Sequence, residues 1–309
     1  MQLFYYADPR GNFGDDLNPR IWNHYVPELL DDDPDSLFIG IGTLLNREIP
    51  QAPRKTVFGA GHGYGRAPVL GDKWDIHCVR GPLTARALGL APSLAITDPA
   101  LLLRDMHDPR EAPRQRRVSF MPHHKSMAKG DWSGVCAAAG VHHIDPGGGV
   151  DRVLDEIRSS RLVIAEAMHG AIVADAFRIP WVPVRCYDHV LAFKWQDWCA
   201  SLGLDYRPVC LPSLFNVDRR ISCATRIKSE TKHALRRLGI APRRWTPPIP
   251  RRTTGREADA ATALLSRLAS GDAASLSDYG RHEGAAQQLA EAIDRLKRGA
   301  TVRGAAAGR

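Results

Sequence analysis

Short apolar runs alternate with helical segments over the first two thirds of the chain. Each apolar run ends at glycine, proline or a polar side chain, which is typical of buried strands. In the first series we expect strands at 2–7, 36–42, 55–61, 75–80 and 94–97, with helices at 16–25 and 83–88. Pro82 near the start of the second helix and Gly89 after its end support that assignment.

A second series follows residues 104–117, a polar stretch rich in arginine and proline that is expected to be a linker. Its strands are expected at 117–122, 141–146, 161–167 and 181–185, with helices near 131–140, 150–159 and 169–177. Alternation of strands and helices implies parallel sheets with right-handed crossovers. The pattern therefore predicts an α/β protein with two units of similar size, residues 1–108 and 115–212.

The last third, residues 213–309, has a different pattern and is expected to be a helical extension. Two alanine-rich helices are expected near 257–269 and 284–298. A further helix is expected at 222–238, where Gly239 follows as a stop signal. Its apolar face consists of Ala224, Ile227, Ala234, Leu235 and Leu238.

The positive charge is concentrated in this extension. The chain has 42 Lys and Arg against 34 Asp and Glu, a net charge of +8. Residues 1–212 hold 23 basic and 25 acidic side chains, whereas residues 213–309 hold 19 and 9. Most of these charges are expected on solvated helix surface, and the alternative is peripheral contact with an anionic membrane or an acidic acceptor. A nucleic-acid enzyme would place positive charge around its core site, so no nucleic acid is expected as a partner.

Composition narrows the class of protein further. Of the 309 residues, 44% are hydrophobic and 25% are charged, which excludes a wholly disordered chain, a collagen and a coiled coil. No apolar run approaches the ~18 residues of a membrane span, and the N-terminus becomes acidic at Asp8, unlike a signal peptide. The six cysteines have neither C-x-x-C nor zinc-finger spacing. We expect a cytoplasmic protein with reduced thiols and no metal site.

The strongest candidate for catalysis is His169. Ligands of parallel sheets bind at the carboxyl ends of the strands, close to helix N-termini. His169 lies at such a turn, between the strand at 161–167 and the next helix, where an imidazole can transfer a proton or bind phosphate. Gly170 would allow a ligand to approach, and Glu166 could orient the imidazole or act as an acid. A capping histidine and a structural glutamate are the alternatives.

Three other segments supply candidate anion ligands. Arg80 ends a strand directly before Gly81-Pro82, where a guanidinium could hold phosphate or carboxylate, or could pair with an acid to fix the turn. His123 and Lys125 follow the strand at 117–122, so they form either an anion site or an exposed loop. Lys194 lies in a tryptophan-rich segment whose aromatic side chains are expected in the core.

The segment GNFGDDLN, residues 11–18, opens the first helix. Gly14 permits a tight turn, and Asn12 and Asp15 add polar groups. The segment is neither a dinucleotide fingerprint nor a P-loop. Two adjacent carboxylates repel phosphate, so we expect a site for sugar hydroxyls, with helix capping as the alternative. Asp98 before Pro99 is likewise either a cap or a functional group.

The order of these motifs resembles the polysaccharide pyruvyltransferase family, and within it the exopolysaccharide ketal-pyruvate transferases of succinoglycan type. The resemblance covers about residues 1–205. The motifs that carry it are GNFGDDLN, GAGHG, VRGPLTARALGL, ITDPALLL, PHHK and EAMHGAIVADAFRIP.

The resemblance implies two Rossmann-like domains facing a cleft, as in GT-B glycosyltransferases, here followed by the basic helical C-terminal segment. It implies transfer of the enolpyruvyl group of phosphoenolpyruvate to two hydroxyls of a sugar, forming a pyruvate ketal without a cofactor. The acceptor would be an oligosaccharide or a lipid-linked saccharide at the inner face of the membrane. His169-Gly170 matches the family's catalytic histidine, and Arg80 matches a substrate-binding arginine.

One departure from the family concerns the residues before the histidine. Many members have arginine and leucine there, whereas this chain has Ala167 and Met168. The donor phosphate would then be held by other cations, for which the candidates are Arg80, His123, Lys125, Arg185 and Lys194.

Two other functions remain open from the sequence. A GT-B nucleotide-sugar glycosyltransferase would need ribose contacts, for which Glu166 is the candidate. A non-enzymatic adaptor would dock on a membrane or polyanion through residues 219–256, where Glu230 is the single acid among twelve basic residues. The extension could also fold back onto the first unit.

Overall fold

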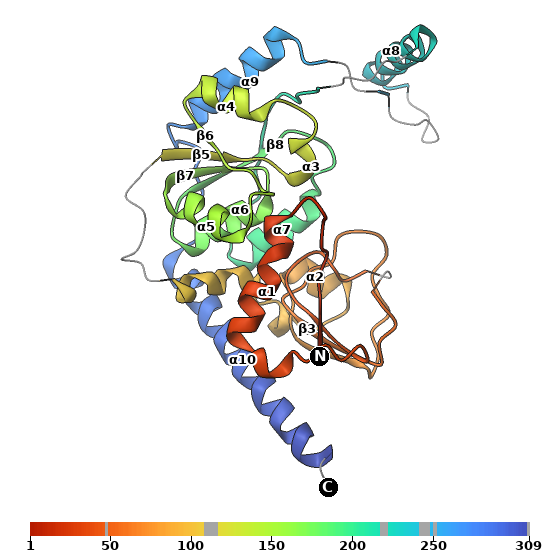
Figure 1. The fold of residues 1–309 in the computed structure, drawn as a ribbon, viewed down its shortest axis with the longest axis vertical. Coiled ribbons are helices and arrows are strands. Elements are labelled where there is room, and N and C mark those ends of the chain that lie inside the picture. The colour runs from red at the N-terminus through yellow and green to blue at the C-terminus, as the bar shows by residue number, and fades with distance from the viewer. Residues whose placement is uncertain (47–48, 108–116, 217–221, 241–247, 250–251, 308–309) are drawn as a thin grey trace.

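The structure is a computed structural model that describes the chain except for residues 47–48, 108–116, 217–221, 241–247, 250–251 and 308–309. Two parallel β-sheets with helices packed around them form its body (Figure 1). The α/β class predicted from the alternating pattern is therefore confirmed.

The first sheet has the strand order β1-β2-β3-β4, and all neighbouring strands are parallel. Every residue of β2, and every residue of β3 after the first, is buried, as expected for strands covered on both faces. Helix α1 (Phe13–Tyr25) follows β1, and Pro82 opens α2 (Pro82–Ala87). The strands are β1 (Gln2–Phe4), β2 (Ser36–Ile39), β3 (Arg54–Phe58) and β4 (Trp74–Cys78).

The second sheet has the order β6-β5-β7-β8-β9 and is also parallel throughout. Its expected strands and helices are present with ends shifted by a few residues. The strands are β5 (Arg117–Met121), β6 (His142–His143), β7 (Ser160–Ala165), β8 (Trp181–Arg185) and β9 (Val209–Cys210). The helices are α3 (His124–Met127), α4 (Trp132–Ala139), α5 (Val150–Arg158), α6 (Met168–Ala176) and α7 (Ala192–Ser201).

The prediction of a strand at 94–97 is wrong. Pro92 opens a 3₁₀ helix, η2 (Pro92–Leu94), and a single bridge from Ala95 to Val79 is what remains of strand pairing. A proline at the first position favours a helical turn over a strand because its φ is fixed and it has no N–H. The expected linker at 104–117 begins inside the next 3₁₀ helix, η3 (Pro99–Met106), and its residues 108–116 lie outside the described part.

The two units share one hydrophobic core cluster. Helix α1 of the first unit packs against α5 and α6 of the second, and α6 packs against η3. Trp22 and Leu103 from the first unit belong to the same cluster as Leu154 and Ala171 from the second. A loop contact adds to this packing, since Phe13 donates its backbone N–H to the carbonyl of Pro146 at 2.9 Å. The packing fixes one sheet relative to the other.

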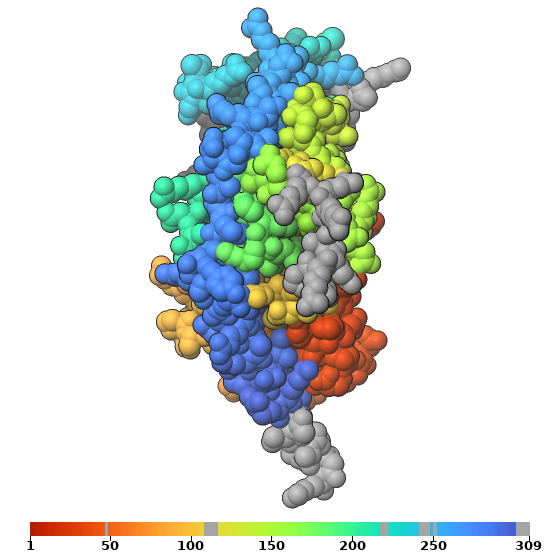
Figure 2. Space-filling model, turned by 90° about the vertical axis from the view of Figure 1, so that its left-hand side faces the viewer, coloured from red at the N-terminus to blue at the C-terminus, as the bar shows by residue number. Residues whose placement is uncertain are grey.

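The extension folds back over both units, one of the arrangements expected from the sequence. Helix α9 (Gly255–Leu268) buries Leu265 on the second unit beside α4, and α10 (Tyr279–Ala307) buries Leu289 on the first beside β4 and η3. Figure 2 shows these helices as a band along one face of the molecule. Helix α8 (Cys223–Arg237) projects from the body instead (Figure 1). None of the described helices combines the length and apolar character that a membrane crossing needs.

Candidate functional site

A cavity of about 510 Å³ lies where the carboxyl ends of the two sheets meet. The segments that line it follow β1, β2 and β5, or open the helices α1, α6 and α7. Parallel sheets bind ligands at this position, as the sequence argument expected. The predicted site residues in its lining are Asn12, Gly14, Asp15, His123, Lys125, His169 and Lys194.

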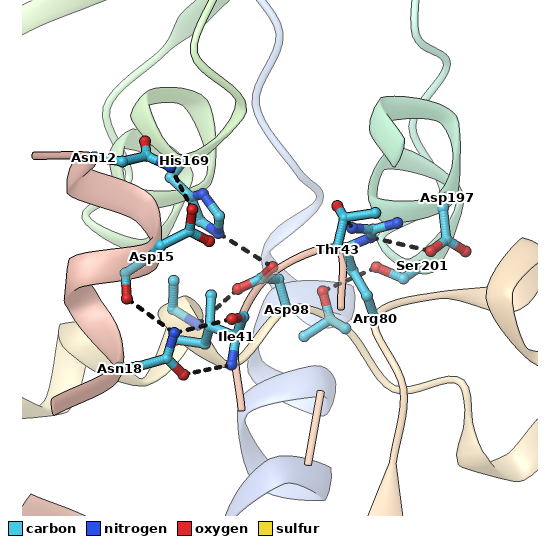
Figure 3. A network of polar contacts seen from close by, with 12 residues as sticks. Asn12, Asp15, Asn18, Ile41, Thr43, Arg80, Asp98, His169, Asp197 and Ser201 are labelled. Atoms are coloured by element: carbon cyan, nitrogen blue, oxygen red, sulfur yellow. Dashed lines mark hydrogen bonds and ion pairs between the residues drawn. The ribbon is translucent and has the colours of Figure 1, made fainter. Parts of the chain in front are cut away.

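His169 lies in the first turn of α6, and its side chain is 14% exposed. Its Nε2 atom is buried and lies 3.5 Å from Oδ2 of Asp98, whose side chain is completely buried (Figure 3). The other oxygen of Asp98 accepts a hydrogen bond of 3.0 Å from the backbone N–H of Ala100 and caps η3. Asp98 is thus a cap, and it is also a carboxylate of the first unit that faces the imidazole of the second.

Gly14 makes room for this imidazole. A Cβ atom at residue 14 would lie 1.9 Å from Nδ1 and 2.5 Å from Cγ of His169. The expected tight turn is not the reason for the glycine, since Gly14 lies inside the first turn of α1 and does not have a positive φ. Close approach of a side chain from the other unit requires it instead.

Asp15 and Lys194 form a second pair of charged groups in the lining. Burial raises the pKa of Asp15 to about 6, against the opposing effect of the charges of His169 and Lys194. Burial and the charge of Arg80 lower the pKa of Lys194 to about 8, against the attraction of Asp15. Asn12 donates a side-chain hydrogen bond to Asp15. At neutral pH both groups are mainly charged, and each titrates within two units of pH 7.

The segment after β5 contributes one cation and two neutral imidazoles. Burial lowers the pKa of His123 far below its usual range and that of His124 to about 4, so both rings are neutral at pH 7. Nδ1 of His123 accepts the backbone N–H of Lys125 at 3.2 Å and caps α3. His123 therefore lines the cavity as expected, but as a neutral group, and Lys125 is the exposed cation of this segment.

Arg80 does not line the cavity, which corrects the expected contact with a ligand. Its side chain is completely buried, and Nε donates to Asp197 at 3.0 Å (Figure 3). Its terminal nitrogens donate to the hydroxyl of Thr43 and to the carbonyl of His62, both at 2.9 Å. A Cβ at Gly61 would lie 2.1 Å from the guanidinium carbon, so the glycine-rich loop packs on this group. The alternative of an ion pair that fixes the turn is what the structure has.

Glu166 and Gly170 are also absent from the cavity lining. Glu166 is completely buried, and its two oxygens accept backbone N–H groups of His123 and Cys186 at 3.0 and 2.9 Å. Burial raises the pKa of this carboxyl, against the lowering by those hydrogen bonds. Gly170 packs against Met121, where a Cβ would lie 2.7 Å from the sulfur. Both residues hold the strand ends behind the cavity rather than facing a ligand.

Some lining residues were missed by the sequence analysis. Tyr5 and Tyr6 follow β1 directly, and Tyr64 comes from the glycine-rich loop after β3. The sequence analysis placed the first two inside the strand expected at 2–7, so the rule used for His169, a polar group just after a strand, did not select them. His189 also contacts this region, with its Nδ1 3.0 Å from the Nζ of Lys129, and no local pattern indicates it. In the described part of the chain, no three His, Cys, Asp or Glu side chains are grouped to hold a metal.

The fold and this cavity define an α/β protein with titratable and cationic side chains where two parallel sheets meet. Residues 3–189 match the family model described as polysaccharide pyruvyl transferase, so the chain belongs to that family. The succinoglycan biosynthesis protein ExoV of Rhizobium meliloti (strain 1021) is 42% identical over 237 residues, which are 76% of this chain and 72% of the relative. No solved structure matches the chain. The protein is a transferase of pyruvyl groups, as the motif order had indicated.

Proposed function

We propose that the donor is phosphoenolpyruvate and that the acceptor is a sugar of a lipid-linked exopolysaccharide precursor, which receives a cyclic pyruvate ketal. Family membership supports pyruvyl transfer to a polysaccharide. The relative is a succinoglycan biosynthesis protein, which supports an exopolysaccharide as the product. The reaction requires cations for the donor, an acid–base group and a site for sugar hydroxyls.

Lys125 and Lys194 are assigned to the anionic groups of the donor. Phosphoenolpyruvate carries a phosphate and a carboxylate, and lysine binds such groups as a point charge. Ala167 and Met168, which stand where the family resemblance implies arginine and leucine, line the same cavity. The two lysines therefore take over the charge of the missing arginine, whereas each of the three guanidinium nitrogens of Arg80 donates to a protein partner.

His169 is assigned to the proton transfers. A proton adds to C3 of the enol phosphate, and a first sugar hydroxyl attacks C2 and loses its proton. Phosphate then leaves with the electrons of its bond to C2, and the second hydroxyl attacks C2 and loses its proton. One of the two hydroxyl protons balances the one taken up by C3, and the other leaves with phosphate. A single group that gives and takes protons suits this sequence.

The observation that carries the proposal is the position of this imidazole. Nε2 of His169 is buried toward Asp98, and the ring passes beside Gly14 in the cavity wall. A carboxylate beside Nε2 favours the tautomer protonated there and holds the ring in one orientation at the cavity wall. Asp98 is a positioning residue in this scheme.

The sugar is assigned to the part of the cavity that is lined by tyrosines. Tyr6 and Tyr64 line it with exposed rings, and Tyr5, Asn12 and Asp15 lie in the same lining. Rings with a polar tip suit a ligand that has both apolar faces and hydroxyls.

The two units would act as Rossmann-like domains in a GT-B-like arrangement, with the donor held in the cavity between their strand ends, where access of water is limited. Their proposed extents are residues 1–108 and 115–212, with 213–309 as the basic helical extension. The proposed location is the cytoplasm, at the inner face of an anionic membrane that carries the acceptor.

His169→Ala tests the assignment directly. We expect donor affinity within a few-fold of wild type and turnover lower by about 10²–10⁴-fold, the usual contribution of general acid–base catalysis. Turnover is measured as phosphate release and as ketal formation on oligosaccharides prepared from exopolysaccharide by mild acid removal of pyruvate. Near-wild-type turnover of the variant would remove His169 from the mechanism.

The donor is tested by ligand-induced stabilisation. Phosphoenolpyruvate should raise the melting temperature of the wild type, whereas UDP-sugars should not. The reverse result would favour a nucleotide-sugar glycosyltransferase and overturn the assignment of the donor.

A further inference from the structure

Helix α8 contacts the rest of the described chain through its polar side. Ser229 is the buried residue of α8, and its hydroxyl donates to the carbonyl of Ile249 at 3.1 Å. The ring Nε2 of His233, one turn further on, lies 3.1 Å from the same carbonyl. The helix starts at Ser222, whose side chain caps it, and ends before Gly239, which has a φ of +75°. Its local structure is therefore that of a well-capped helix.

The apolar side of α8 faces solvent. At about 100° per residue, Ile227 and Leu238 lie on the face opposite Ser229 and His233. Ile227 is 64% exposed, Leu238 is 72% exposed, and Ile240 just after the helix is 60% exposed. These three are among only seven large hydrophobic side chains exposed in the described part of the chain, so the apolar exposure is concentrated on this segment.

The charge of the helix identifies the kind of partner. Residues 223–238 carry five Lys or Arg and one acid, Glu230, which pairs with Arg226 at 3.3 Å. Two copies of such a helix would repel each other, whereas an anionic surface attracts it by about 1 kcal/mol per basic residue. A basic helix with one apolar face is the form that lies in the interface of an anionic bilayer.

We propose that α8 is a membrane-docking helix. It lies parallel to the surface of an anionic bilayer, inserts Ile227, Leu238 and Ile240 among the lipid headgroups, and places its basic side chains beside the phosphates. On the polar side, Ser229 and His233 keep their contacts with the carbonyl of Ile249. Helix α8 would thus be the part of the chain that makes the membrane contact of the proposed function. The inference rests on the proposed function for the location of the acceptor. The docking itself is independent of turnover.

The test uses the full-length chain and vesicles of phosphatidylcholine with or without 30% phosphatidylglycerol, separated by sedimentation. We expect wild type to bind the anionic vesicles at least about tenfold better than the neutral ones. Ile227→Ser with Leu238→Ser should lower binding to anionic vesicles by about tenfold or more. The matched control is Val69→Ser, because Val69 is 81% exposed on a different surface and its replacement should leave binding unchanged.

Several outcomes would overturn the proposal. These are equal binding of wild type to neutral and anionic vesicles, unchanged binding of the double variant, or an equal loss with Val69→Ser. If light scattering shows a dimer that the double variant dissociates while vesicle binding persists, the apolar face is an interface between copies.

The melting temperature in the presence of phosphoenolpyruvate is measured on the same samples. A double variant that loses vesicle binding but keeps the donor-induced shift supports docking by α8. Vesicle binding without any donor-induced shift in the wild type would contradict the proposed donor while leaving the docking helix supported.

Discussion

Two of the contacts between basic and acidic side chains of the two units involve a completely buried carboxylate, and they differ in the hydrogen bonds that the basic group makes. Arg80 of the first unit pairs with Asp197 of α7, and His169 of α6 pairs with Asp98 of the first unit (Figure 3). In both pairs the carboxylate is completely buried. The guanidinium donates to Asp197, Thr43 and a carbonyl, whereas the imidazole lines the cavity.

The comparison separates a basic side chain that holds the two units together, Arg80, from one that borders the cavity, His169. Asp197 also accepts two backbone N–H groups of α2, from Leu83 and Thr84, at 2.9 Å, so this pair fixes how α7 sits on the first unit. A buried pair with every partner in place cannot bind a ligand without losing those bonds. Of the two basic groups, His169 is the one that borders the cavity.

The largest effect is expected when the buried pair of Arg80 and Asp197 is broken. Arg80→Met leaves Asp197 buried without its cation, and loss of one partner of a buried pair typically costs about 3–5 kcal/mol. We expect the free energy of unfolding, measured in urea, to fall by that amount. His169→Ala is the control at the other pair and should change stability far less, because its ring borders a cavity. An Arg80→Met protein of normal stability that fails to bind phosphoenolpyruvate would instead make Arg80 a ligand.

A smaller effect is expected from Gly14→Ala, which tests how the ring of His169 is oriented toward Asp98. The new methyl group would overlap the His169 ring and turn it away from Asp98. Displacement of a catalytic group by about 1 Å can cost 10²-fold in rate, so we expect a loss of turnover of that order. Gly71→Ala is the matched control, because a Cβ there meets nothing within 4 Å and Gly71 does not have a positive φ. Equal turnover of the two variants would contradict the role of the close approach.

The smallest expected effect is a shift of a pH profile. The pKa of Lys194 is lowered to about 8, so kcat/KM for phosphoenolpyruvate should fall above that pH as the ammonium loses its proton. Lys194→Arg should remove this alkaline limb, because a guanidinium stays charged. Asp15→Asn should move the limb to lower pH, since the charge of Asp15 raises the pKa of Lys194. A limb that neither variant moves would belong to another group.

Much of the fold and part of the site followed from local patterns. The range of β8 and the position of His169 in the first turn of α6 agree with the sequence expectation. The strand at 94–97 failed because a proline-led turn outweighed a short apolar run. Among residues chosen as polar groups just after a strand, Asn12, Asp15 and Lys125 line the cavity. The same rule also selected Arg80 and Glu166, which do not line it.

The sequence by itself determined the strand–helix alternation and the amphipathic helices of the extension, because these depend on periodicity and on residues a few positions apart. Only the tertiary structure decided that Arg80 pairs with Asp197, 117 residues away, and that Asp98 faces His169. It also decided that α10 buries its apolar face while α8 exposes its own. Which groups meet depends on how separate elements pack, and packing brings together residues that local spacing does not relate.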